Sequence, residues 1–176
     1  MENNKRNMPS TPDHIESAPN PNIPESVWAD GVPANIDEAD KIKPEELHNM
    51  AIDYVMKKVI LPKGFKIEQG FPRRDFPNIV MKRDGIIYMV VVFPSVFPSY
   101  ATPNDDFRLK IVENAKKFDA VALYAPVGYK SIDEERAKAQ LTLKGDVFQT
   151  TFPGFIRLTD APTQDFNVKP EELFRP

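Results

Sequence analysis

The sequence predicts an α/β domain of the α+β type, built on a mixed sheet, over residues 44–160. Three observations lead to this prediction. Segments with the apolar spacing of helices alternate with short apolar runs that are typical of strands. An Asp-Gly pair joins two of these runs into a β-hairpin over residues 76–93. Both faces of that hairpin are mainly apolar, so we expect it to be covered on both sides and to lie centrally in the sheet.

The first two elements are a helix and a strand. Residues 44–60 begin with a proline and two glutamates, which favour a helix start, and their apolar residues recur at helical spacing. Pro62 and Gly64 are expected to end this helix. The segment FKIEQGF, residues 65–71, is predicted to be the first strand.

The register of the hairpin follows from its turn. If Asp84-Gly85 is a two-residue loop, Arg83 faces Ile86, and the pairing continues until Asn78 faces Val91. Alternation of side chains then puts the following residues on one face: Asn78, Val80, Lys82, Ile87, Met89, Val91 and Phe93. The opposite face is expected to carry another set: Ile79, Met81, Tyr88, Val90 and Val92.

The second half of the domain continues the alternation. A cap at Thr102 followed by Pro103 predicts a helix to about residue 118, and residues 119–127 read as a buried strand. Ser131 and Glu134 match a capping box that opens a short helix to about residue 143. A broken strand or a hairpin is expected within residues 147–158. The predicted order is helix, three strands, helix, strand, helix, strand.

Composition limits the classes of protein. The 176 residues are 41% hydrophobic and 28% charged, with a formal net charge of -3, as expected of one soluble domain. The absence of cysteine excludes disulfides and thiolate metal sites. No apolar run approaches the length of a membrane span, and the N-terminal residues lack the apolar core of a signal peptide. We therefore expect a cytoplasmic protein with no membrane association.

The two flanks differ from the domain in composition. Residues 1–43 are rich in proline and polar residues and are predicted to form a disordered N-terminal arm. Their apolar island contains Trp28, the single tryptophan, which either docks on the domain or forms part of a partner-binding motif. Residues 161–176 are predicted to be an extended C-terminal tail.

The order of elements, the segment PNIV at 77–80 and the strand YMVVVF at 88–93 resemble the PD-(D/E)XK nuclease superfamily, whose members have a restriction-endonuclease-like core. The resemblance covers about residues 44–127. It implies that two acids bind magnesium and that a lysine activates water. These roles would fall on Asn78, Val91 and Phe93, none of which supplies the charge that the chemistry needs. The resemblance therefore implies a non-catalytic, degenerate nuclease motif without a metal or other cofactor.

Other acids near the hairpin could replace the missing metal ligands, so that catalysis would be retained. Acids migrate within this superfamily, and Asp75 and Glu68 are the candidates to replace the missing ligands. Asp84 is better explained as a turn former. A divergent nuclease that uses Asp75 or Glu68 with magnesium thus stays open as one hypothesis. His48 is expected to be a partly exposed helix residue.

Phe-Pro dipeptides and basic residues gather around the expected cleft. Their phenylalanines either fill the interior or form a stiff aromatic rim that binds a protein. The candidate rim residues are Phe76, Phe93, Phe97 and Tyr100. Arg73 and Arg74 would contact phosphates if the domain binds nucleic acid. The leading functional prediction is a non-catalytic protein-interaction or scaffold module, and nucleic-acid binding without cleavage is the second. The oligomeric state is left open.

Overall fold

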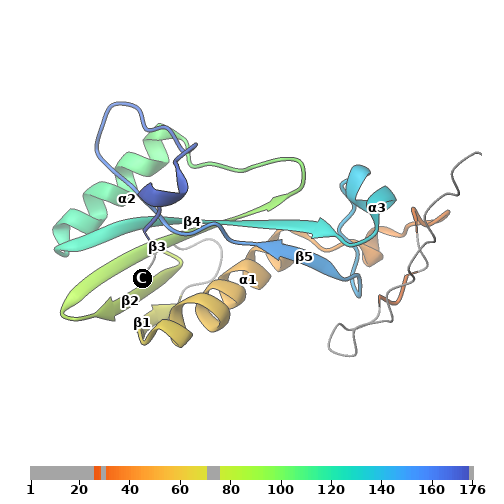
Figure 1. Ribbon diagram of the computed structural model, residues 1–176, viewed down its shortest axis with the longest axis horizontal. Helices are drawn as coiled ribbons and strands as arrows, with labels where there is room; N and C mark the ends of the chain where they lie inside the picture. Colours follow the sequence, from red (N-terminus) through yellow and green to blue (C-terminus); the bar gives the residue numbers. More distant parts are fainter. Residues whose placement is uncertain (1–25, 29–30, 71–75, 175–176) are drawn as a thin grey trace, which may run out of the picture.

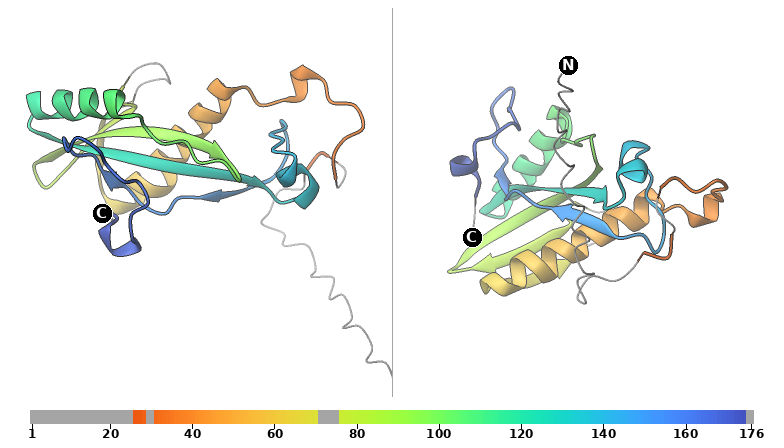
Figure 2. Two further views of the ribbon diagram at one scale, coloured as in Figure 1. Left: turned by 90° about the horizontal axis from the view of Figure 1, so that it is seen from above. Right: turned by 45° about the vertical axis from the view of Figure 1, so that its right-hand side comes forward.

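A computed structural model describes residues 26–28, 31–70 and 76–174 of the chain. Within these ranges the fold is a mixed sheet of six strands in the order β1-β2-β3-β4-β5, with β6 paired to β4 (Figure 1). Helix α1 (Pro44–Tyr54) covers one face and α2 (Asp105–Lys117) covers the other (Figure 2). The predicted mixed α/β class is confirmed.

The helical stretch that begins at Pro44 runs as far as predicted, but its last turns change geometry. After α1 the chain forms a π-helical turn, Val55–Ile60, and then a 3₁₀ turn, Leu61–Lys63. Gly64 ends the stretch with φ +76°, a left-handed conformation that glycine adopts without a Cβ penalty.

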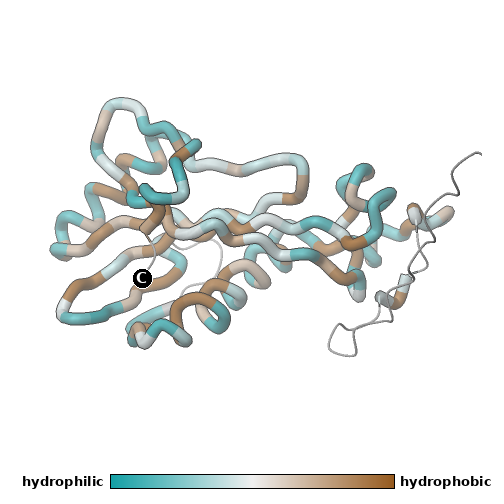
Figure 3. The backbone as a smooth tube through the Cα atoms, viewed as in Figure 1, coloured by the Kyte–Doolittle hydropathy of each residue, from teal (hydrophilic) through white to brown (hydrophobic). Residues whose placement is uncertain are grey.

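The hairpin comprises β2 (Ile79–Arg83) and β3 (Ile86–Val96), and β1 (Lys66–Gly70) pairs with β2. Its turn residues Asp84 and Gly85 have φ values of +51° and +82°, as a two-residue hairpin turn of type I′ requires. Arg83 faces Ile86, which confirms the predicted register from there to Ile79. Figure 3 shows hydrophobic residues along both strands and a hydrophilic turn.

The hairpin is central, and the two predicted faces are both buried. Residues Ile79, Met81, Tyr88, Val90 and Val92 pack with α1 in one hydrophobic cluster. Met89 and Val91 pack with α2 in a second cluster on the other face. The prediction that the hairpin is covered on both sides is therefore confirmed.

Strands β3 and β4 (Ala120–Ser131) are parallel, with α2 as their connection, and both are longer than predicted. The predicted hairpin ended at Phe93, before Pro94, but the pairing of β3 continues to Val96. The N–H of Val92 points toward β2. An N–H group two residues later, at position 94, would point to the same side, but β2 begins at Ile79 and does not extend that far. The proline therefore removes no ladder bond.

Pro126 occupies an equivalent place on the other side of β4. Strand β5 (Phe148–Thr151) pairs with Gly128 to Ser131, and β6 (Ile156–Arg157) pairs with Leu123 and Tyr124. Pro126 lies in the gap between the β5 and β6 pairings, where no neighbouring strand requires an N–H donor from β4. The predicted broken closing strand corresponds to β5 and β6.

The caps of the two later helices differ from the predicted ones. Asn104 caps α2 by accepting a hydrogen bond from the N–H of Phe107, where Thr102 was expected. Asp133 caps α3 (Glu134–Lys138) by accepting from the N–H of Arg136, where Ser131 was expected. The helix α3 also ends about one turn earlier than predicted. Several polar residues precede each helix, and the backbone path selects which one reaches the free N–H groups.

Part of the segment predicted to be disordered packs on the domain. Ile42 donates its N–H to the carbonyl of Thr142 (2.8 Å), and Asp40 accepts one from the N–H of Lys144 (2.8 Å). The 3₁₀ turn η1 (Glu38–Asp40) lies just before these contacts. These hydrogen bonds to a distant loop, which composition does not reveal, offset the entropy of ordering the segment.

The C-terminal segment also lies against the domain, with a 3₁₀ turn η4 (Pro170–Glu172). The backbones of Phe155 and Phe174 exchange two hydrogen bonds. The fully buried side chain of Arg108 donates to the carbonyls of Ala161 (2.7 Å) and Pro162 (3.3 Å). Across the described ranges, no helix combines the length and apolar character needed to cross a membrane.

Candidate functional site

The position that the resemblance assigns to the first acid is Asn78, and its side chain supports the sheet. Asn78 is fully buried just before β2. Its Oδ1 accepts a hydrogen bond from the N–H of Val92 (2.7 Å), and its own N–H donates to the carbonyl of Val90 (2.9 Å). The predicted pairing of Asn78 with Val91 is absent from the ladder, which starts at Ile79. The amide side chain takes the place of a backbone partner for β3.

The positions of the second acid and the lysine lie in the α2 side of the core. Val91 is fully buried in that cluster. The ring of Phe93 packs against Phe107 and Tyr124, with ring centroids 5.7 Å away in each case. The side chains of Asn78, Val91 and Phe93 offer a cation a single neutral oxygen, that of the Asn78 amide, and this oxygen already accepts a hydrogen bond from a backbone N–H. They do not fit a magnesium ion, which requires several oxygen ligands.

The substitute acids are dispersed. Glu68 is exposed on edge strand β1, at an irregularity in its pairing with β2, and forms an ion pair with Lys66 (3.1 Å). Asp84 is a turn residue, as predicted. Asp75 lies outside the described residues. In the part of the chain that the structure describes, no three His, Cys, Asp or Glu side chains are grouped closely enough to hold a metal ion.

The predicted aromatic rim divides into an inner pair and an outer pair. Phe76 stacks on Phe93 with 6.5 Å between centroids, and both pack on the α2 side of the core. Phe97 and Tyr100 lie in the segment after β3, where Tyr100 is 76% exposed. Tyr100 lines a cleft of about 590 Å³ beside the Pro126 gap, together with the C-terminal segment at residues 164–168. The four aromatic residues therefore do not form one surface.

Of the 18 basic residues within the described ranges, 10 form ion pairs with acids. Lys117 contacts Glu113 (3.2 Å), and Lys116 contacts Asp160, whose pKa this hydrogen bond lowers. The guanidinium of Arg83 lies 4.3 Å from the centroid of the Phe65 ring. Arg73 and Arg74 fall outside the described residues. This pattern does not favour a phosphate-binding face.

One buried side chain, His48, departs from a sequence-based expectation, and a second, Tyr129, buries a hydroxyl group. His48 is 7% exposed, so the prediction of a partly exposed residue is wrong; its ring lies 6.3 Å from that of Phe76. Tyr129 is buried on β4, its hydroxyl lacks a hydrogen-bond partner among the described residues, and burial raises its pKa.

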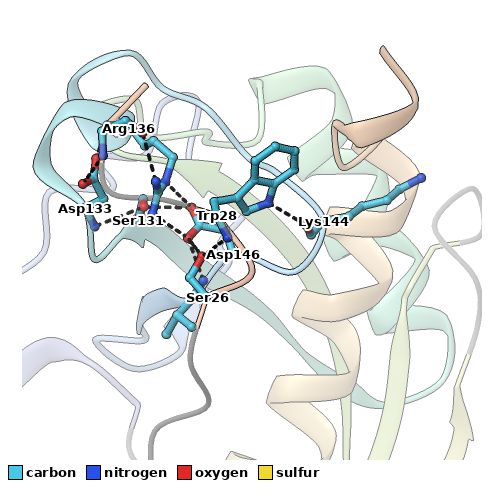
Figure 4. Close-up of polar contacts among 9 residues, drawn as sticks. Ser26, Trp28, Ser131, Asp133, Arg136, Lys144 and Asp146 are labelled. Atoms are coloured by element: carbon cyan, nitrogen blue, oxygen red, sulfur yellow. Dashed lines mark hydrogen bonds and ion pairs between the residues drawn. The ribbon is translucent and has the colours of Figure 1, made fainter. Parts of the chain in front are cut away.

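A buried ion pair between Arg136 and Asp146 was missed by the sequence reasoning (Figure 4). Both side chains are almost completely buried. The Nε of Arg136 lies 3.1 Å from Oδ2 of Asp146, and Nη2 lies 3.2 Å from Oδ1. Asp146 also accepts from the hydroxyl of Ser131 (2.8 Å) and the N–H of Val147 (2.8 Å). This network orders the corner between α3 and β5.

The same corner binds residues 26–28 and Gly31 of the N-terminal segment. The hydroxyl of Ser26 donates to Oδ1 of Asp146 (3.1 Å). The indole N–H of Trp28 donates to the carbonyl of Lys144 (2.8 Å), as Figure 4 shows. We call this corner the clamp. It comprises the side chains of Ser131, Asp133, Arg136 and Asp146 and the carbonyls of Lys144 and Gly145.

Gly31 is held from both sides by the clamp. Its N–H donates to Oδ2 of Asp133 (2.7 Å), and its carbonyl accepts from Nη1 of Arg136 (2.9 Å). Hydrogen bonds from the backbone N–H groups of Arg136 and Gly31 lower the pKa of Asp133. Of the two interpretations of Trp28, the docked one describes its position. The sequence signal was limited to the helix cap around residues 131–134, because the remaining partners are far apart along the chain.

Comparison with known proteins gives one match. A family model described as a domain of unknown function (DUF8840) matches residues 45–158. A search of the curated proteins and a search of the solved structures each found no match. The matched range contains the buried residues of both hydrophobic clusters and all residues of the clamp, whereas Ser26, Trp28 and Gly31 precede it.

Proposed function

The chain belongs to the DUF8840 family of domains of unknown function, and we propose that its domain is a non-catalytic, nuclease-like module that binds another protein. The order of a helix, three strands, a helix and a strand supports the nuclease-like part of this proposal. The use of Asn78, Val91 and Phe93 as interior residues supports the loss of catalysis.

The observation that carries the proposal is the hydrogen bond from the N–H of Val92 to Asn78. A metal-binding carboxylate at this position would need open coordination sites and access to substrate. Here the side chain is fully buried and its oxygen completes the hydrogen bonding of β3. The position therefore stabilises the sheet, and a role in binding fits better than one in cleavage.

A cleavage assay tests the loss of catalysis. We expect no cutting of supercoiled plasmid, single-stranded DNA or RNA in Mg²⁺ or Mn²⁺ by the full chain. Metal-dependent cutting that disappears in Glu68→Ala or Asp75→Ala would contradict the proposal and support a divergent nuclease. Retained cutting in both variants would instead point to a contaminating nuclease in the preparation.

A binding assay tests the interaction role. We expect a protein captured by the full chain to bind again, at defined stoichiometry, when both are purified. Salt-sensitive binding of DNA or RNA that weakens in an Arg73→Ala/Arg74→Ala variant would instead support the nucleic-acid hypothesis. A chain that forms no stoichiometric complex with any purified candidate would contradict the proposed role.

A further inference from the structure

The clamp recognises the main chain of the segment that it binds. One glycine, Gly31, donates its N–H to Asp133 and accepts through its carbonyl from Arg136, at 2.7 Å and 2.9 Å. The N–H of Val27 donates to the carbonyl of Gly145 (3.1 Å) in the same way. Main-chain hydrogen bonds of this kind provide affinity for an extended segment, and side-chain contacts provide its specificity.

Two side chains of the bound segment supply that specificity. Ser26 donates its hydroxyl to Asp146, and the Ser26 oxygen accepts from the N–H of Trp28 (3.2 Å). The indole of Trp28 then reaches the carbonyl of Lys144. The pattern that the clamp reads is a hydroxyl residue, tryptophan two positions later, and glycine three positions after the tryptophan.

The clamp is organised by contacts that do not involve the bound segment. Asp146 already accepts from Ser131, Arg136 and Val147. Asp133 caps α3 through one oxygen and has the other directed at Gly31. Because these contacts remain without the segment, the site is preorganised, which lowers the free-energy cost of binding.

The bound segment is held mainly by polar contacts. Val27 is 77% exposed with its methyl groups beside Gly145, and Trp28 is only partly buried. Polar contacts of this kind contribute modestly to stability in water. The segment is therefore suited to exchange with another segment of the same pattern. The clamp lies within the matched family range and the segment outside it.

We propose that the clamp is a peptide-binding site that takes an extended segment of a partner protein with a hydroxyl residue, tryptophan and glycine in this spacing. Ser26, Trp28 and Gly31 occupy it in cis and compete with the partner. The inference rests on the proposed interaction role and names the binding site and the partner's chemistry.

The cis segment sets the threshold that a partner must overcome. A tethered segment acts at an effective concentration on the order of millimolar, so it competes strongly with a free peptide. Weakening the tethered segment without changing the clamp should therefore raise the apparent affinity for an added peptide. The strong competitor in the wild-type chain makes this increase measurable.

The test uses the full chain and a fluorescein-labelled peptide with the sequence of residues 24–33. The cis segment is weakened in Ser26→Ala/Gly31→Ala, because Gly31 has φ +89°, where alanine is strained. We expect this variant to bind the peptide at least about tenfold more tightly than the wild-type chain, because the cis segment loses both hydrogen bonds of the Ser26 hydroxyl and gains strain at residue 31. Fluorescence anisotropy measures the affinity.

Asp133→Asn is the clamp variant and keeps the fold. Asparagine caps helices as well as aspartate does, but its amide group would present a donor to the N–H of Gly31. We expect this substitution, added to the weakened chain, to reduce peptide binding at least tenfold. Equal binding with and without Asp133→Asn would overturn the proposal, and circular dichroism verifies that α3 and the sheet persist.

Displacement is measured directly at Trp28, the single tryptophan of the chain. With 5-fluorotryptophan incorporated, one ¹⁹F signal reports the docked segment, and saturating unlabelled peptide should move it to the position of a solvent-exposed indole. An unchanged signal at saturation would overturn the proposal. A stable wild-type dimer in light scattering, with peptide unable to displace Trp28, would assign the clamp to a second copy and would also overturn it.

The two proposals fail in different ways. Absence of peptide binding, together with a purified partner that binds normally to Asp133→Asn, would remove the clamp inference and leave the interaction role intact. Metal-dependent cleavage would remove the non-catalytic role, whatever the peptide does.

Discussion

The environment of Asn78 and the clamp are both buried polar sites, but they differ in what they bind. Asn78 accepts from Val92, 14 residues away, within the same sheet. Asp146 accepts from Ser26, 120 residues away, in a segment outside the matched family range. The first site completes the hydrogen bonding of one element, and the second joins an element to a separable segment. Burial of a polar group thus serves folding in one case and docking in the other.

The largest expected effect comes from breaking the ion pair that organises the clamp. Asp146→Ala removes the buried carboxylate that forms two hydrogen bonds with the guanidinium of Arg136. We expect a loss of about 3–5 kcal/mol in the free energy of unfolding. Urea denaturation followed by circular dichroism measures this loss. A loss below about 1 kcal/mol would show that the pair does not organise the corner.

Removal of the amide at the motif position should have the next largest effect. Asn78→Ala leaves the N–H of Val92 buried without an acceptor, so we expect a loss of about 1–3 kcal/mol. The matched variant Asn78→Asp restores an acceptor but buries a charge. It should be less stable than wild type at neutral pH and gain no stability from millimolar Mg²⁺. Stabilisation by Mg²⁺ would revive a metal role for this position.

The cis segment should contribute little to the stability of the domain. Trp28→Ala removes the indole contact to Lys144, and we expect a loss of about 1 kcal/mol or less. Val27→Ala, at an exposed position, is the matched control. A loss several times larger for Trp28→Ala would make the segment an integral part of the fold and would weaken the contrast drawn with Asn78.

The smallest expected effect is a pH dependence of segment docking. The pKa of Asp133 is lowered below its ordinary value of 3.8 by N–H groups of Arg136 and Gly31. A lowered pKa in the docked state stabilises docking above the ordinary value, and this contribution is lost as pH falls through the lowered one. The fluorescence of Trp28 should therefore shift toward that of an exposed indole only in acid. Asp133→Asn should remove this transition.

The sequence predicted a feature correctly where the interacting residues are close together along the chain. The hairpin register followed from Asp84-Gly85 because turn and strands are adjacent, and the alternating faces followed from the register. The end of β3 was misplaced because Pro94 stops a strand only where a neighbour needs its N–H. The predicted strand 119–127 already contained Pro126, and β4 continues beyond it to Ser131. The sequence shows that Asn78, Val91 and Phe93 lack the charges of the nuclease motif. It does not show that the Asn78 side chain accepts a hydrogen bond from the N–H of Val92.

The clamp could not be predicted, again for a physical reason. Arg136 and Gly31 are 105 residues apart, and no local spacing indicates their contact. Polar, proline-containing segments are commonly disordered, and the docking of residues 26–28 and 31–43 depends on hydrogen bonds to acceptors and donors that only the folded domain provides. Trp28 was the one visible signal, because an isolated tryptophan in such a segment needs an explanation.

The two prolines of the parallel strands have a further consequence for how the sheet meets other molecules. An exposed sheet edge invites a foreign strand, because its free N–H and carbonyl groups form a template for aggregation. At the gap beside β4, the residue that faces outward is Pro126, which has a carbonyl and no donor. Pro94 likewise presents no N–H donor at the place where β3 extends past the start of β2. These two openings in the sheet therefore offer a foreign strand no backbone donor, which disfavours edge-to-edge association at both places.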